Sequence, residues 1–382
     1  MPGLLPDVDP DGLLEYSVVY TDRAVNHMSA KFQGVMRDIS ALLKDVYKAR
    51  SAIVVPGSGT FGMEAVARQF ATGKKTLVIR NGWFSYRWTQ ILEMGAIPAA
   101  STVLKARRVA EQHQAAFAPA PIAEVVAAIQ AERPDVVFAP HVETSAGMVL
   151  PDDYLRQVAA ATHAVGGLFV LDCIASGTLW VDMADIGIDV LVSAPQKGWS
   201  GPPCAALVML GEQARQRIDA TTSTSFARDL KKWLQIMETY EAGGHAYHAT
   251  LPTDALTQVR DVMQETRARG FELVRTQQWA LGEAVRAALE RRGFKSVAAP
   301  GFRAPGVVVS YTDDAAIHTS KAFAALGLQT AAGVPLQCDE PADFKTFRIG
   351  LFGLDKLADV AGALARLETA LDQLAPAARQ AA

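Results

Sequence analysis

The fold class is decided by two stretches, Leu168-Phe169-Val170-Leu171-Asp172 and Val190-Leu191-Val192-Ser193-Ala194-Pro195-Gln196-Lys197-Gly198. Each begins with a short run that is apolar at successive positions and then turns polar. Strands buried between two layers of helices have this pattern, because both of their faces are covered. We therefore predict two strands of one buried sheet, with Asp172 and Lys197 at or just past their carboxyl ends.

Similar runs recur on both sides of these stretches, from about residue 50 to residue 210. The other predicted strands are Ala52–Val55, Thr76–Arg80, Val136–Pro140 and Ala205–Leu210. Helical stretches such as Gly62–Phe70 and Tyr154–His163 separate several of them. Alternating strands and helices predict an α/β fold with a largely parallel, doubly wound sheet.

The pattern changes after about residue 250. Long helices are predicted over Asp254–Arg267 and Phe271–Arg292, with Gly270 as a break and Gly293 as a stop. Next come predicted strands and helices at Gly306–Tyr311, Ile317–Leu326, Phe347–Leu351 and Leu357–Leu374. We expect an N-terminal segment (1–30), a large domain (31–253) and a small α+β domain (254–382). The segment 1–30 has no place in the parallel sheet and is a candidate to join the small domain.

Composition excludes several classes of protein. The chain has 382 residues, of which 50% are hydrophobic and 20% charged, so it is not disordered. Its 37 basic and 40 acidic residues give a net charge of −3, which predicts neither a nucleic-acid nor an anionic-membrane partner. We find no long apolar run and no targeting peptide, so we expect a cytoplasmic protein. Cys173, Cys204 and Cys338 fit neither a disulfide framework nor a zinc site.

The first candidate for chemistry is the turn Pro56-Gly57-Ser58-Gly59-Thr60, which follows a predicted strand and opens a helix. Glycines allow close backbone approach, and a helix N-terminus offers free N–H groups to a phosphate. The alternative is an ordinary tight turn in which Ser58 or Thr60 caps the helix.

The other candidates are Asp172 and Lys197. A carboxylate at a strand end can hold a cationic partner, although it can also simply cap the next helix. A desolvated lysine has a lowered pKa and can form a Schiff base, although most lysines are only solvated. A phosphate site, a carboxylate and such a lysine on one sheet are what pyridoxal 5'-phosphate requires. An aromatic cover for its ring is expected within Asn81-Gly82-Trp83-Phe84-Ser85-Tyr86-Arg87.

The order of these motifs resembles that of class V (subgroup IV) pyridoxal-phosphate aminotransferases, close to the alanine–glyoxylate and serine–pyruvate enzymes. The resemblance runs from about residue 30 to residue 375. It depends on the order and spacing of seven motifs. They are the turn at Gly57, the segment at Asn81, His141-Val142-Glu143-Thr144-Ser145-Ala146-Gly147, Asp172, Gln196-Lys197, Tyr247-His248-Ala249-Thr250 and Arg348-Ile349-Gly350. It implies the type I fold of pyridoxal-phosphate transferases, which is aspartate aminotransferase-like, and a homodimer with shared active sites.

The resemblance also implies a role for individual residues. Lys197 would carry the Schiff base and move a proton, and Asp172 would pair with the pyridine nitrogen. Phe84 would stack on the ring in preference to Trp83, and Thr144 would lie near the ring oxygen. The implied phosphate ligands are Ser58, Gly59, Thr60 and Gln196, with Tyr247 and Thr250 serving the neighbouring subunit. Arg348 would bind the carboxylate of small amino acid and 2-oxo acid substrates.

Alternatives remain at this point. A transaminase of an ω-amine such as 2-aminoethylphosphonate would differ only in residues around the substrate. A lyase or cysteine desulfurase shares the fold class, but Gln196 precedes the lysine and Cys338 lies in a short segment. A non-catalytic cofactor-binding module would generally carry a DNA-binding domain, which is not visible before residue 30. The segment leading to His27-Met28-Ser29 departs from the family pattern, which leaves substrate identity open.

Overall fold

The computed structural model describes residues 13–379. A central sheet has the strand order β1-β11-β10-β9-β6-β2-β3. The strands span Ser51–Pro56 (β1), Lys75–Arg80 (β2), Ala100–Lys105 (β3), Val136–Pro140 (β6), Leu168–Asp172 (β9), Val190–Ser193 (β10) and Ala205–Leu210 (β11). From β3 to β10 neighbouring strands are parallel, whereas β11 is antiparallel to both β10 and β1. The mainly parallel sheet is thus confirmed.

Helices cover both faces of this sheet, since every residue of β6, β9, β10 and β11 is buried. The helices of this part of the chain are Ala30–Tyr47 (α1), Gly59–Phe70 (α2), Trp83–Met94 (α3), Ile122–Glu132 (α4), Asp152–Ala164 (α5), Met183–Ile186 (α6), Glu212–Ile218 (α7) and Leu230–Glu241 (α8). Two small hairpins pair Arg107–Arg108 (β4) with Phe117–Ala118 (β5), and Val142–Glu143 (β7) with Met148–Val149 (β8).

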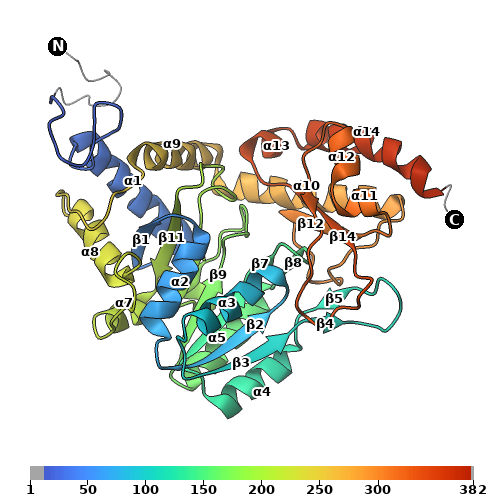
Figure 1. The fold of residues 1–382 in the computed structure, drawn as a ribbon, viewed down its shortest axis with the longest axis horizontal. Helices are drawn as coiled ribbons and strands as arrows, with labels where there is room; N and C mark the ends of the chain where they lie inside the picture. The colour runs from blue at the N-terminus through green and yellow to red at the C-terminus, as the bar shows by residue number, and fades with distance from the viewer. Residues whose placement is uncertain (1–12, 380–382) are drawn as a thin grey trace.

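The helices Thr253–Arg269 (α9) and Phe271–Arg291 (α10) lead from the central sheet to a second, three-stranded sheet (Figure 1). That sheet has the order β12-β14-β13 and is antiparallel. Its strands are Val307–Tyr311 (β12), Ala331–Ala332 (β13) and Thr346–Gly350 (β14). The helices around it are Ala315–His318 (α11), Lys321–Ala325 (α12), Leu354–Ala358 (α13) and Val360–Arg379 (α14). The division of the chain at residues 31 and 254 stays a prediction.

Two predicted helices are wrong in detail. The one expected over Ile317–Leu326 is split into α11 and α12 at Ser320, whose φ is 61°. The one expected over Leu357–Leu374 is split into α13 and α14 at Asp359. Apolar residues on both sides of the first break, such as Ile317 and Phe323, still pack into one core. The helical spacing of apolar residues therefore continues past Ser320, which is why the sequence pattern did not predict the break.

The described part of the N-terminal segment packs against Leu251 and the start of α9, and its expected place in the small domain stays a prediction. The Tyr20 hydroxyl donates to the carbonyl of Leu251 (3.0 Å), and the backbone N–H of Val25 donates to Asp254 (3.1 Å). The first twelve positions of the predicted segment lie outside the described residues. Within residues 13–379, no helix is long and apolar enough to cross a membrane.

Candidate active site

Asp172 and Lys197 lie at the carboxyl ends of adjacent parallel strands. Asp172 ends β9 and pairs in register with Val192 of β10, and Lys197 follows in the turn after β10. The N–H of Gly201 closes this turn on the carbonyl of Pro195 (3.0 Å). A Cβ atom on Gly198 would lie 2.1 Å from the carbonyl oxygen of Gly177, so only glycine fits beside the lysine. The sequence thus fixes the backbone that carries Lys197.

Burial moves both groups toward their neutral forms. Desolvation raises the pKa of Asp172 to about 6, although the nearby Lys197 ammonium lowers it. Desolvation also lowers the pKa of Lys197, while the Asp172 carboxylate raises it. One carboxylate oxygen of Asp172 accepts from the N–H of Ile174 (2.9 Å), which holds the side chain in place. A lysine amine of lowered pKa is a better nucleophile, as the sequence prediction requires.

The aromatic ring of Phe84 is the common neighbour of the cationic groups. The Nζ atom of Lys197 lies 5.8 Å from its centroid, and the guanidinium carbons of Arg87 and Arg348 lie at 5.3 and 5.6 Å. Trp83 instead pairs with Tyr86, at 5.8 Å between ring centroids. Of these two aromatic rings, Phe84 is therefore the one beside Lys197, and its stacking on the cofactor ring stays a prediction.

A fully buried carboxylate fixes the helix that carries Phe84. Glu143 accepts hydrogen bonds from the backbone N–H groups of Phe84 (3.2 Å) and Ser85 (2.8 Å), at the first turn of α3. It also accepts from the backbone N–H of Ser145 (3.0 Å). A Cβ on Gly82 would lie 2.1 Å from the Ser145 hydroxyl oxygen, so this approach needs glycine. An anion at a helix N-terminus satisfies N–H groups that have no intrahelical partner.

The predicted phosphate turn opens α2. Ser58 precedes that helix without capping it through its side chain, so the capping alternative is not what the hydroxyl does. Gly59 packs closely enough that a Cβ would lie 2.6 Å from Cδ1 of Ile174. The Thr60 hydroxyl accepts from Nη1 of Arg87 (2.9 Å). A helix N-terminus, a free hydroxyl and a guanidinium together suit a phosphate.

Two further predicted residues directly follow or precede residues of the candidate site in the sequence. Thr144 is buried and directly follows Glu143. The Oε1 atom of Gln196, next to Lys197, is buried without a hydrogen-bond partner among the described residues. A buried polar atom left unpaired beside the candidate lysine indicates that a further polar group belongs there. The residues present therefore fit pyridoxal phosphate.

Arg348, on β14 of the three-stranded sheet, approaches Phe84 and so lies beside the candidate site. Its Nε atom donates to the carbonyl of Ala332 (2.9 Å) on β13, which orients the guanidinium. Neither of its Nη atoms makes a hydrogen bond within the part of the chain that the structure describes. Burial lowers the pKa of Arg348, whereas Glu143 raises it. The free edge of the guanidinium is suited to a planar carboxylate.

Within one chain, Tyr247 and Thr250 have no hydrogen bond to Asp172, Lys197 or the other candidate site residues that the structure describes. Both are exposed, and their hydroxyl groups lie 3.1 Å apart. The ring of Tyr247 lies 5.6 Å from that of His27 in the N-terminal segment. Their predicted role therefore requires a second subunit.

Sequence reasoning missed three residues of the site. Glu143 and Arg87 stood inside the quoted motifs without a role. Phe352, whose ring centroid lies 5.7 Å from the Nζ atom of Lys197, follows β14 and had no signal of its own. Its position depends on how the two sheets pack, which a linear pattern does not report.

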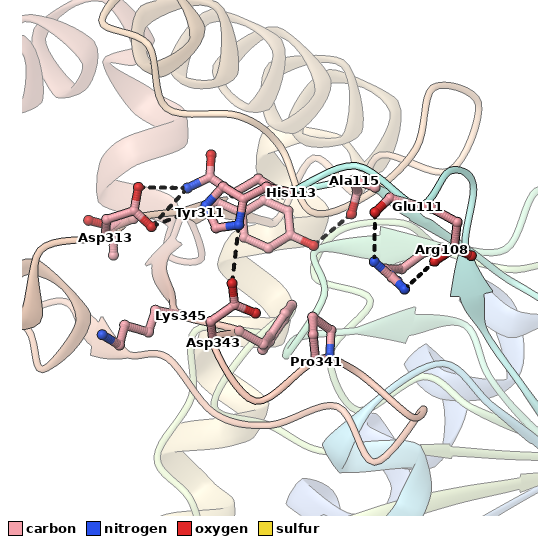
Figure 2. A pocket seen from close by; sticks show the side chains of 12 residues that line it. Arg108, Glu111, His113, Ala115, Tyr311, Asp313, Pro341, Asp343 and Lys345 are labelled. Carbon is pink, nitrogen blue, oxygen red and sulfur yellow. Dashed lines mark hydrogen bonds and ion pairs between the residues drawn. The ribbon is translucent and has the colours of Figure 1, made fainter. Parts of the chain in front are cut away.

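Other polar features lie apart from this site. A cavity of about 260 Å³ lies between the loop that joins β4 to β5 and two loops beside the three-stranded sheet. Figure 2 shows the side chains that line it. There the imidazole of His113 lies between the carboxylates of Asp313 (3.4 Å) and Asp343 (3.2 Å). None of its lining residues is a predicted site residue. Within residues 13–379 no group of three or more His, Cys, Asp or Glu side chains could hold a metal.

The three cysteines are free and buried. Burial raises the pKa of Cys338 to about 12, and its Sγ atom lies 3.5 Å from the carbonyl oxygen of Arg80. A thiol of such high pKa is a poor nucleophile at neutral pH. This observation disfavours a desulfurase in which Cys338 attacks.

The family model described as aminotransferase class-V matches residues 13–323, so the chain belongs to the class V aminotransferases. Members of this family use pyridoxal phosphate, and the chain is accordingly an aminotransferase that depends on this cofactor.

Individual relatives differ in the substrates that their names state. The chain is 28% identical to 2-aminoethylphosphonate–pyruvate transaminase 2 of Paraburkholderia xenovorans, over 92% of this chain and 90% of that protein. It is 27% identical to alanine–glyoxylate aminotransferase of Rattus norvegicus, over 65% of this chain and 58% of that protein. A crystal structure of alanine–glyoxylate aminotransferase from Nostoc superposes with a TM-score of 0.75 at 21% identity, covering 91% and 89% of the two chains. Such structural neighbours confirm the type I fold.

Proposed function

We propose that this aminotransferase moves an amino group from a small L-amino acid, such as alanine or serine, to glyoxylate or pyruvate. The observation that carries the proposal is the position of Arg348, whose guanidinium carbon lies 5.6 Å from the Phe84 ring centroid. Its Nη atoms make no hydrogen bond to any residue between 13 and 379. A guanidinium fork binds a carboxylate in two parallel hydrogen bonds. An α-carboxylate is the one anionic group that alanine, serine, glyoxylate and pyruvate share.

The bound cofactor supplies an aldehyde carbon and an electron-withdrawing ring that accepts electron density from the substrate Cα. In our proposal Asp172 holds positive charge at the ring nitrogen, and the face of Phe84 covers the ring. The first turn of α2 holds the phosphate through Ser58, Gly59 and Thr60, with Gln196 and Arg87 beside it. Thr144 lies near the ring oxygen.

Lys197 has two tasks in this proposal, to hold the cofactor through Nζ and to carry a proton to and from the substrate Cα. Its lowered pKa suits both, because it increases the fraction of neutral amine, and only the neutral amine can accept a proton. Burial by Phe84 and Phe352, at 5.8 and 5.7 Å from Nζ, restricts water near the amine. With one site for both substrates, donor and acceptor react in turn by a ping-pong mechanism.

We also propose a cytoplasmic homodimer in which Tyr247 and Thr250 contact the phosphate of the partner subunit. The exposure of Tyr247 (53%) and of the neighbouring Phe226 (79%) supports a covered surface in the assembly. The Tyr247 hydroxyl already lies against Thr250 (3.1 Å), so the two could bind one phosphate together. Tyr247→Phe should weaken cofactor retention measured by dialysis, and a fully active monomer at low concentration would contradict the proposal.

A second candidate is the transamination of 2-aminoethylphosphonate with pyruvate. It is favoured by the relative from Paraburkholderia xenovorans, whose match spans most of both chains. A phosphonate is also an oxyanion, and Arg348 could bind it in place of a carboxylate.

A donor and acceptor panel followed by single-turnover absorbance separates the two candidates. Alanine or serine should convert the cofactor faster than 2-aminoethylphosphonate does, and glyoxylate or pyruvate should reverse the change. Arg348→Lys should weaken donor and acceptor together, because both lose the bidentate contact. A donor without an α-carboxylate that outperforms every α-amino acid would overturn the proposal in favour of the second candidate.

A further inference from the structure

A second cavity lies at the boundary between the central sheet and α10. Its volume is about 560 Å³, which is within the usual range for small-molecule pockets. The chain after β8, the loop after β9 and the first turns of α10 form its walls. Many of its lining residues are apolar, among them Leu179, Val181, Trp180 and Trp279.

One of the three arginines that line this cavity, Arg275, has no charged partner among the described residues. Arg275, on α10, is half-buried and makes no hydrogen bond or ion pair with any residue that the structure describes. The other two arginines of the cavity are paired, Arg156 with Asp185 (2.6 Å) and Arg303 with Glu290 (3.0 Å). A guanidinium partly removed from water and left beside apolar walls is costly unless an anion joins it. Arg275 therefore supplies a specific site for a negative group.

The opposite charge is available in the same cavity. Asp152, at the start of α5, lines it and has no hydrogen-bond partner for its carboxylate within residues 13–379. The lining thus has three features, an apolar wall, the cation of Arg275 and the carboxylate of Asp152. A ligand with an apolar group, a carboxylate and an ammonium would match all three. Apolar α-amino acids have this chemistry, and the corresponding carboxylic acids share two of the three parts.

The cavity is separate from the candidate active site but shares structural elements with it. His141 lines the cavity, and its backbone N–H donates to the carbonyl of Asp172 (2.8 Å). The ring of Trp180 lies 4.5 Å from that of Trp199, which follows Gly198 beside Lys197. A ligand held here would thus contact residues that support both Asp172 and Lys197 without reaching either side chain.

We propose that this cavity is a second binding site, for a small carboxylate that carries an apolar or aromatic group, with Arg275 as its anion-binding residue. The source of the carboxylate is a free amino acid or a carboxylic acid without an amine. The proposal does not depend on which amino acid the active site uses.

The probe is 3-phenylpropionate, which has neither an amino nor an oxo group and so cannot be transaminated. Titration of the cofactor-loaded protein, followed by calorimetry and tryptophan fluorescence, should show saturable binding, because Trp180 and Trp279 line the cavity. Arg275→Met, which removes the guanidinium but keeps an unbranched apolar side chain, should weaken binding roughly tenfold or more. Trp279→Leu should weaken it independently of charge.

Two variants locate the site. Arg348→Met should leave the binding of 3-phenylpropionate unchanged if the probe sits in the cavity. Arg267→Met, an exposed position on α9 outside the cavity, is the matched control and should also have no effect. Absence of saturable binding, or binding that Arg348→Met abolishes and Arg275→Met preserves, would overturn the proposal.

A last comparison identifies the source of the carboxylate. In the Arg348→Met protein, L-phenylalanine that binds more tightly than 3-phenylpropionate, with the difference removed by Asp152→Asn, would identify amino acids as the ligands. Equal or weaker binding of L-phenylalanine would identify carboxylic acids without the amine. Weaker binding of both compounds in Arg275→Met is required in either case.

Discussion

Glu143 and Ser85 are joined twice by the same carboxylate oxygen. Oε2 of Glu143 accepts from the backbone N–H of Ser85 at 2.8 Å and from its hydroxyl at 2.7 Å. The second oxygen accepts from the Ser145 hydroxyl at 2.7 Å. Glu143 therefore links the chain after β6 to the first turn of α3, which presents Phe84 to Lys197. It acts on the site through Phe84 and is a positioning residue.

We expect Glu143→Gln to misplace Phe84 and destabilise the fold. A glutamine side chain has one acceptor oxygen, and its NH₂ group would face N–H and O–H donors. Leaving buried donors unpaired costs about 1–3 kcal/mol. Thermal unfolding should show that loss, and turnover should fall with it. Ser85→Ala should reproduce part of both effects, whereas Glu124→Gln, an exposed control, should reproduce neither. Wild-type turnover and stability in Glu143→Gln would contradict the positioning role.

Lys197→Ala should abolish transamination while the protein still binds the cofactor through its phosphate contacts. Both the covalent attachment and the proton transfer at Cα depend on Nζ in our proposal. Borohydride reduction of the wild-type protein followed by peptide mapping should find the cofactor on Lys197. Lys345→Ala, at the cavity of Figure 2, is the control and should keep its activity. A label on any other lysine would refute the assignment.

Asp172→Asn should lower turnover by roughly two or more orders of magnitude, because an amide cannot balance the charge of a protonated ring nitrogen. The side chains have nearly the same shape, and the oxygen can still accept from the N–H of Ile174. Cofactor binding and thermal stability should therefore change much less than turnover. Turnover within about twofold of the wild type would show that Asp172 only stabilises the chain after β9.

The buried strands of the central sheet were predictable because their runs are apolar on both faces. All six predicted strands are confirmed, including Val190–Ser193. The edge strand β3 was missed, since its first residues Ala100 and Ser101 are exposed and break the apolar run. The antiparallel pairing of β11 with β1 could not be predicted either, because the sequences of both strands have the apolar pattern of any buried strand. Packing decides such pairings.

In the candidate site, too, local sequence patterns predicted some residues, whereas the positions of others depend on packing. Asp172 and Lys197 could be identified because each ends a recognisable strand. The role of Glu143 could not, since its donors come from Ser85 and Phe84, which are far from it in the sequence. Likewise, the approach of Arg348 to Phe84 depends on how the three-stranded sheet packs on the central one. The resemblance to class V enzymes suggested the carboxylate ligand that periodicity alone would not.

The last prediction concerns stability and pH at the start of β9. Nε2 of His163 lies 2.8 Å from Oδ2 of Asp189, which also accepts from the backbone N–H of Phe169 (2.7 Å). The bond to Asp189 raises the pKa of His163 above its usual value, although burial opposes this. A histidine whose folded pKa is raised contributes stability that is fully present below its unfolded pKa of about 6.5. That contribution is lost as the pH rises through the folded pKa.

His163→Gln should therefore destabilise the protein more at about pH 5.5 than at about pH 8.5, because the contribution of the raised pKa is lost as the pH rises. Urea unfolding at both pH values measures the difference in unfolding free energy between wild type and variant. His245→Gln, at an exposed position, is the matched control for the loss of one imidazole. The pair is partly exposed, so the effect should shrink in high salt, as expected for a charge interaction. An equal loss at both pH values would mean that the His163 side chain stabilises β9 only as a neutral hydrogen-bond donor.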